Sequence, residues 1–224
     1  GWWFGREPEP KSGNVQIMAE AIQPGQSRAV VTLADGQQIV LEQANRKIEE
    51  SDGTVLHSDS GALVYTANAE KTVAKVMYNK VSIPRGGEYR LELADGTKVW
   101  LNAATELRFP VNFTGDMREV YLKGEAYFQV KRDEKHPFIV HTSMGAVEVL
   151  GTSFNVRDYE DEREVVTTLE TGKVMYVSGN TREKVTLNPG YQVLEKESSP
   201  VEVRKVDPLQ YTGWREGKYV FEDV

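Results

Sequence analysis

The chain has 224 residues, a length that suits one large or two small domains with a substantial buried core. Charged residues make up 27% of it and the formal net charge is −7, which argues against a nucleic-acid partner because phosphates demand clustered lysine and arginine. Cysteine is absent, which excludes disulfides and cysteine metal sites but does not fix the compartment. No apolar run reaches about 18 residues, so nothing in the sequence predicts a membrane-spanning helix.

Residues 1–14 predict an extended connector, because Pro8, Pro10 and Gly13 interrupt any regular element. The aromatic start at residues 2–4 leaves two interpretations open. Aromatic side chains favour the membrane–water interface, so this start fits the outer end of a transmembrane helix. It equally fits a tag remnant or a plug of the core.

Residues 15–80 predict a first group of strands. Residues 17–22 predict a strand, and residues 29–41 predict a hairpin around the turn Leu-Ala-Asp-Gly. Turn-forming residues bracket short strands over the next stretch, whereas residues 69–77 predict a loop or an irregular strand.

Residues 81–206 predict a second, longer run of strands. Apolar and polar residues alternate over 89–93 and again over 99–101, with a tight Asp-Gly turn between them. This pattern predicts a hairpin. Its turn repeats the Leu-Ala-Asp-Gly of residues 33–36, which favours internal repetition of a β unit, with coincidence as the alternative.

Further short strands follow at even spacing, with glycine or Pro-Gly between most of them. They are predicted at residues 120–130, 138–141, 147–150, 153–156, 165–169, 174–177, 185–187, 192–194 and 201–203. Such spacing predicts an all-β sandwich, barrel or solenoid. Asp207 and Pro208 then predict the cap and first residue of a short helical segment within residues 207–224.

Several ordered blocks of this sequence resemble the FecR family of anti-sigma regulators, most closely its members from Bacteroides-like bacteria. The blocks are residues 83–89, 93–102, 124–128, 137–138, 149–156, 168–169, Gly172, residues 187–190, Trp214 and Gly217. Together they extend over more than half of the chain and are far more specific than any single short motif.

The resemblance implies a twisted, solenoid-like β sandwich of many short strands that forms the periplasmic part of a single-pass inner-membrane protein. Residues 1–14 would be the membrane-proximal connector, residues 15–206 the β domain, and residues 207–224 a lead-in to a C-terminal α/β domain outside this sequence. The membrane helix and the sigma-binding part would also lie outside it. The implied partners are an extracytoplasmic-function (ECF) sigma factor and the signalling domain of an outer-membrane TonB-dependent transporter, without an enzymatic activity or a cofactor.

The Gly151-Thr152 bond is a candidate for self-cleavage. A threonine hydroxyl in a tight turn can attack the preceding carbonyl if the peptide is strained, which gives an ester that water opens. Some FecR-like regulators are processed in their periplasmic part, and this bond resembles such a site. The alternative is that the turn simply requires small residues.

Other polar residues favour structural roles. Glu125 lacks an acid–base partner in the sequence pattern and is expected to pair with an arginine, such as Arg90 or Arg118, or with backbone N–H groups. The histidines have no metal-ligand spacing and are expected to be surface or core residues; they are His57, His136 and His141. An acidic cluster predicts a solvated turn rather than a calcium loop, and comprises Glu160, Asp161, Glu162 and Glu164.

Two other functions remain open. A carbohydrate-binding β module would use exposed aromatic rings, for which Trp100 and Trp214 are the candidates, although both occupy FecR-like positions that favour packing. A structural cell-envelope module would have no sigma factor at all, and a sigma-factor gene next to this one would exclude it.

Overall fold

The computed structural model describes residues 29–41, 46–50, 54–59, 62–66 and 76–216. The predicted connector at 1–14, the strand at 17–22, most of the segment 69–77 and residues 217–224 lie outside the described residues. Strands account for 56% of the structure and helices for 6%, which confirms the all-β prediction. Among the described residues, no helix is long and apolar enough to cross a membrane.

The strands form two sheets that share one long strand, β10 (Arg118–Gln129). Sheet A contains, in spatial order, β2 (Gln38–Leu41), β1 (Ala29–Thr32), β6 (Tyr78–Ile83), β9 (Thr105–Pro110), the first half of β10, β11 (Phe138–His141), β12 (Gly145–Val149), β15 (Val174–Ser178) and β16 (Lys184–Leu187). Sheet B contains β3 (Arg46–Glu49), β4 (Val55–Asp59), β5 (Ala62–Thr66), β7 (Tyr89–Glu92), β8 (Lys98–Leu101), the second half of β10, β13 (Ser153–Asp158), β14 (Glu164–Thr171), β17 (Tyr191–Lys196) and β18 (Glu202–Lys205).

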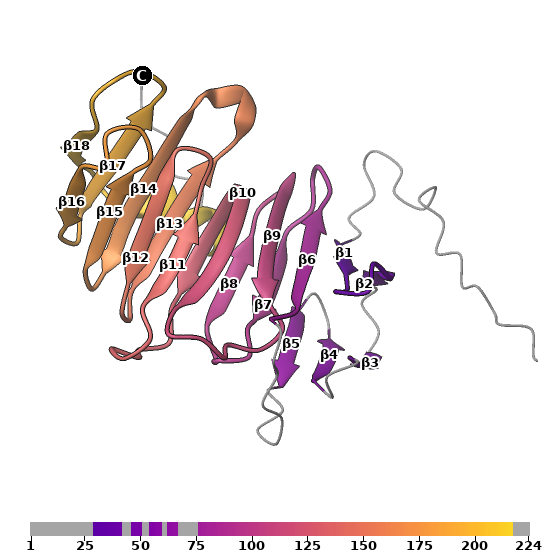
Figure 1. Ribbon diagram of the computed structural model, residues 1–224. Helices are drawn as coiled ribbons and strands as arrows, with labels where there is room; N and C mark the ends of the chain where they lie inside the picture. The colour runs from indigo at the N-terminus through magenta and orange to yellow at the C-terminus, as the bar shows by residue number, and fades with distance from the viewer. Residues whose placement is uncertain (1–28, 42–45, 51–53, 60–61, 67–75, 217–224) are drawn as a thin grey trace, which may run out of the picture.

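After β10 the chain adds hairpins to the two sheets in turn. The β11–β12 and β15–β16 hairpins extend sheet A, and the β13–β14 and β17–β18 hairpins extend sheet B (Figure 1). Most neighbouring strands are antiparallel, and β10–β11 and β5–β7 are parallel. The result is the twisted, solenoid-like sandwich expected from the family resemblance.

Strand β10 passes from sheet A to sheet B at Gly124. Residues up to Tyr121 pair with β11, whereas residues from Gly124 onward pair with β13. The φ angle of Gly124 is +107°, and a Cβ placed there would lie 2.4 Å from Oγ1 of Thr105. Only glycine accepts both the backbone angle and this close approach.

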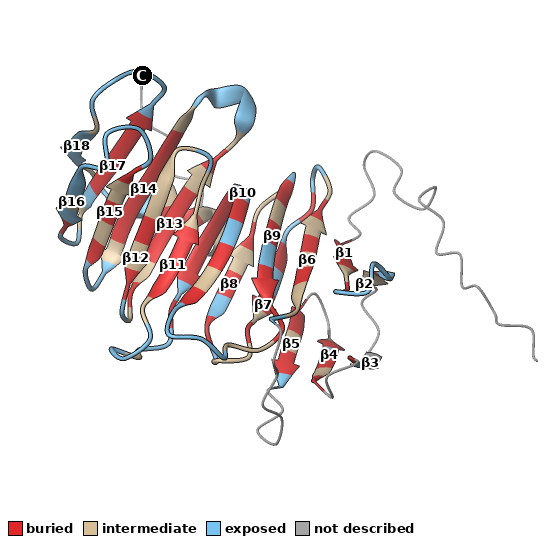
Figure 2. Cartoon of the chain, in the orientation of Figure 1, coloured by how far each residue is buried: buried red, intermediate tan, exposed pale blue. Residues whose placement is uncertain are grey.

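The core lies between the two sheets, where buried aromatic rings meet. The ring of Phe128 stacks on Phe154 with centroids 5.1 Å apart and contacts Phe138 of sheet A at 6.1 Å. In strands such as β6, β7 and β8, alternate residues are buried, and these strands show alternating bands of burial in Figure 2.

The two Leu-Ala-Asp-Gly turns have the same local geometry. In each, the leucine N–H donates to the carbonyl four residues on at 2.8 Å, and the glycine has a positive φ, +88° at Gly36 and +91° at Gly96. The first turn joins β1 to β2 in sheet A, and the second joins β7 to β8 in sheet B. Whether residues 15–80 and 81–206 are repeated units stays a prediction.

Candidate functional site

The C-terminal helical segment, α1 (Leu209–Thr212) followed by the 3-10 turn η3 (Gly213–Glu216), folds back onto the outer face of sheet B. Oδ1 of Asp207 accepts a hydrogen bond of 3.1 Å from the backbone N–H of Leu209, which satisfies an orphan donor of the first turn. The segment packs against β13 and β14, and Figure 1 shows it in yellow behind the strands.

A polar network joins this segment to the centre of sheet B. Nε1 of Trp214 donates to Oδ1 of Asn155 at 2.9 Å, and Nδ2 of Asn155 donates to Oε2 of Glu125 at 3.0 Å. Oε1 of Glu125 accepts from Nδ2 of Asn102 at 2.8 Å and from Nη1 of Arg157 at 3.2 Å. Both oxygens of this carboxylate, which is only 4% exposed, are therefore satisfied.

An arginine pairs with Glu125 as predicted, but it is neither of the two named in the prediction. Arg157, not Arg90 or Arg118, makes the ion pair, because Glu125 of β10 and Arg157 of β13 stand opposite each other in the sheet. Arg118 is instead buried against Asp95, with Nη1 and Oδ2 2.8 Å apart.

A stack of side chains holds the end of the segment. The guanidinium of Arg215 lies over the rings of Tyr127 and Trp100, at 4.1 and 5.1 Å from their centroids. Cation–aromatic contacts of this kind are worth about 0.5–2 kcal/mol. Trp100 and Trp214 thus both contact the protein's own side chains, as the packing interpretation requires, rather than serving as free platforms for a sugar.

The Gly151-Thr152 bond lies in the short connection between β12 and β13. A Cβ on Gly151 would lie 2.7 Å from Cβ of Arg132, so packing requires a glycine there. Thr152 is buried, and its hydroxyl donates to the carbonyl of Lys173 at 3.0 Å. In the described part of the chain, neither histidine nor carboxylate hydrogen-bonds this hydroxyl, so the acyl shift stays a hypothesis beside the packing explanation.

The family model described as "FecR protein" matches residues 79–175, which include Glu125, Asn155 and the Gly151-Thr152 bond. Two solved structures of a "putative anti-sigma factor" from Parabacteroides distasonis ATCC 8503 are similar to this chain, with 36% and 37% identity and TM-scores of 0.60 and 0.59. Residues 79–175 therefore form a FecR domain within this chain.

The two solved relatives match 62% of this chain, and the matched part spans 65% of each solved chain. A comparison with curated proteins gives no match. The predicted resemblance to FecR proteins is confirmed, and the FecR domain accounts for β6 to the start of β15. The docked residues Trp214 and Arg215 lie outside it.

The histidines of this chain occupy separate positions. Nδ1 of His136, within the FecR domain, lies 2.8 Å from Oδ2 of Asp133, and the hydrogen bond from this histidine lowers the pKa of the Asp133 carboxyl. Nε2 of His141 lies 3.1 Å from Oε1 of Glu119, and His57 is exposed on β4.

The acidic cluster begins in an exposed 3-10 turn, η2 (Glu160–Glu162). Glu162 pairs with Arg157, and Glu164 pairs with Lys196 at 3.9 Å. Within the described ranges, no three histidine, aspartate or glutamate side chains are placed to hold a metal ion together.

Asn155 is another residue of this network that the sequence did not single out. It is a buried amide between the core residues Phe154 and Val156, and an asparagine in the middle of an apolar strand indicates a specific polar partner. That partner, Trp214, lies 59 positions away, so the strand pattern alone does not identify it.

Proposed function

We propose that this chain is the periplasmic signalling region of an inner-membrane anti-sigma factor. In this role it relays a signal from an outer-membrane TonB-dependent transporter to a cytoplasmic ECF sigma factor, and a single N-terminal membrane helix connects it to the sigma-binding part. The FecR domain and the solved anti-sigma relatives support the anti-sigma role.

The observation that carries the proposal is the attachment of the C-terminal segment to sheet B. The contact of Trp214 with Asn155 ties this segment to β13, and the contact of Asn155 with Glu125 continues to β10, which belongs to both sheets. A partner that moves the segment therefore acts directly on the strand around which the domain is built. Such a link suits a module that transmits contact rather than one that performs chemistry.

The test is transcription from a promoter that the neighbouring sigma factor recognises. Cells with the wild-type gene should respond to the transporter's ligand, and cells in which residues 76–216 are deleted in frame should lose that response. A response that is unchanged by the deletion, or the absence of any sigma factor controlled by the gene, would exclude this function.

A further inference from the structure

The outer face of sheet A carries four side chains in contact, one from each of four adjacent strands. We call Tyr78 of β6, Arg108 of β9, Tyr121 of β10 and His141 of β11 the stacked row. The guanidinium of Arg108 lies 4.3 Å from the ring centroid of Tyr78 and 5.0 Å from that of Tyr121. The imidazole of His141 stacks on Tyr121 at 4.8 Å and 18°.

The register of the strands explains why these side chains lie next to one another. Tyr121 stands opposite Arg108 on one side and opposite His141 on the other. Arg108 and His141 therefore flank the Tyr121 ring, and the residue stays 37% exposed. A sugar stacks on an open ring face, so this arrangement favours a protein partner, for which ordered tyrosine and arginine side chains are typical anchors.

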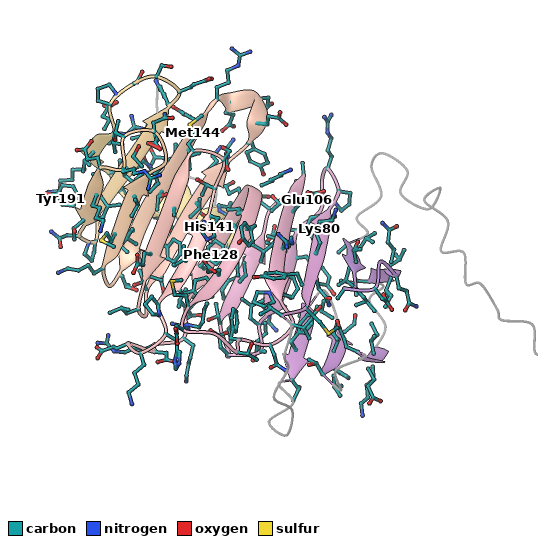
Figure 3. The ribbon with its side chains drawn as sticks, in the orientation of Figure 1. Lys80, Glu106, Phe128, His141, Met144 and Tyr191 are labelled. Carbon is teal, nitrogen blue, oxygen red and sulfur yellow. The ribbon has the colours of Figure 1, made fainter. Side chains whose placement is uncertain are left out.

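The charges around the row are unevenly paired. Glu106 forms an ion pair with Lys80 at 3.8 Å, and Glu119 contacts His141; Lys80, Glu106 and His141 are labelled in Figure 3. In the part of the chain that the structure describes, Arg108 and Lys123 are exposed and have no carboxylate within 4.0 Å. This leaves unpaired positive charge beside the exposed ring of Tyr121 and the half-buried ring of Tyr78, in a chain whose net charge is −7.

On sheet B, a similar cluster of aromatic rings is covered by another part of the chain. There Arg215 of the docked segment lies over Tyr127 and Trp100, so arginine and aromatic rings meet across a contact between two parts of the chain. On sheet A the arginine and the rings all come from the sheet itself. The row also borders a groove of about 1660 Å³ that His141, Lys123 and Glu106 help to line.

We propose that the stacked row is a docking surface for a partner protein that presents a carboxylate to Arg108 and apolar side chains to the ring edges of Tyr78 and Tyr121. This inference rests on the proposed function, because it assigns the surface through which the transporter's signalling domain contacts the β domain. Mixed charges around an aromatic centre match the general composition of specific interfaces.

The test is a nuclear magnetic resonance titration of the isotope-labelled chain with the unlabelled signalling domain of the transporter encoded beside it, since this method detects weak binding and locates it. We expect shifts concentrated on β6, β9, β10 and β11 at positions facing out of sheet A. Arg108→Glu and Tyr121→Ala should each weaken binding by about tenfold or more, as interface anchors do. Lys205→Glu, an exposed charge reversal on β18, should leave the affinity unchanged.

The outcomes separate the inference from the proposed function. Shifts elsewhere, or equal binding by Arg108→Glu and the wild type, would overturn the docking surface and leave the transcription test unaffected. Concentration-dependent self-association that Arg108→Glu removes would show that the row is an interface between two copies of the chain, which also overturns it. Absence of any shift at millimolar concentration would reject the surface, and only the transcription test would decide the signalling role.

Discussion

The indole Nε1 of Trp214 donates a hydrogen bond of 2.9 Å to Oδ1 of Asn155, which is 59 positions earlier in the chain. Asn155 is only 2% exposed, because the C-terminal segment covers it. An amide oxygen left without this donor would lie buried and unsatisfied, at a cost of about 1–3 kcal/mol. The bond therefore stabilises both the segment and the sheet beneath it.

Trp214→Phe tests this relationship because phenylalanine keeps an aromatic ring but cannot donate. We expect the free energy of unfolding to fall by about 1–3 kcal/mol in urea denaturation. Leu209→Ala is the matched control, since Leu209 lies in the same segment but is 43% exposed, and a change within about 0.5 kcal/mol is expected there. Equal losses in the two variants would mean that the hydrogen bond contributes nothing specific.

Gly124→Ala should be among the most damaging small substitutions in this domain. The added Cβ would meet Thr105 at 2.4 Å, in addition to the strain of a positive φ. Gly36→Ala is the control, because Gly36 has a φ of +88° but a Cβ placed there would meet nothing within 4 Å. We expect a loss of about 1–2 kcal/mol at Gly36 from backbone strain alone and a further loss of about 1–3 kcal/mol at Gly124 from the clash. Equal melting temperatures for the two variants would contradict this account of β10.

Local signals in the sequence predicted local structure well. The Asp95-Gly96 turn predicted the β7–β8 hairpin that the structure contains. Asp207 was predicted to cap the last helical segment, and its side chain accepts a hydrogen bond from the first turn. The partner of Glu125 could not be predicted in the same way. Residue alternation shows which face of a strand a side chain occupies, but the strand lying alongside depends on the whole fold, and here it places Arg157 opposite Glu125.

The contacts within the stacked row and the contact of Trp214 with Asn155 were not predicted, for the same reason. Tyr121 and His141 are 20 positions apart and look unrelated in the sequence, yet the parallel pairing of β10 with β11 places them opposite each other. The only long-range information in the sequence was the family resemblance, which predicted the architecture but not these contacts.

The acyl-shift hypothesis for Gly151-Thr152 predicts two fragments, residues 1–151 and 152–224, when the purified chain is incubated and weighed by mass spectrometry. Thr152→Ala should abolish them because the nucleophilic hydroxyl is gone, whereas Thr152→Ser should retain them. An intact wild-type chain after long incubation would reject autonomous cleavage. It would support the explanation in which Thr152 serves only to bond the carbonyl of Lys173.

Alkaline pH should unfold the protein because its buried tyrosines ionise more readily in the unfolded state. Burial is the main cause of raised pKa values for six of the ten, namely Tyr65, Tyr78, Tyr89, Tyr127, Tyr159 and Tyr176. In the unfolded chain these phenols ionise near pH 10, so above that pH the unfolded state loses protons that the native state keeps. Stability is therefore fully present below about pH 10 and falls as the pH rises further.

The measurement is tyrosinate absorbance followed together with far-ultraviolet circular dichroism as the pH is raised. We expect a large part of the absorbance change to coincide with loss of the β signal. The same protein in concentrated denaturant is the control, in which all tyrosines should titrate together near pH 10. Complete titration while the β signal persists would show that burial does not protect these phenols.

The last prediction is that residues 1–224 bind the transporter's signalling domain more weakly than a version extended through the C-terminal α/β domain that the family resemblance implies. An exposed strand edge on such a domain can pair with a partner strand through main-chain hydrogen bonds, a source of affinity that the stacked row of sheet A does not offer. A contact made by that row alone would fall among the small, weak interfaces. Calorimetry measures the affinity of each version for the signalling domain. Trp214→Ala in the longer version tests whether the contact of Trp214 with sheet B positions the added domain. Equal, tight binding by both versions would show that the β domain is itself the surface that reads the receptor.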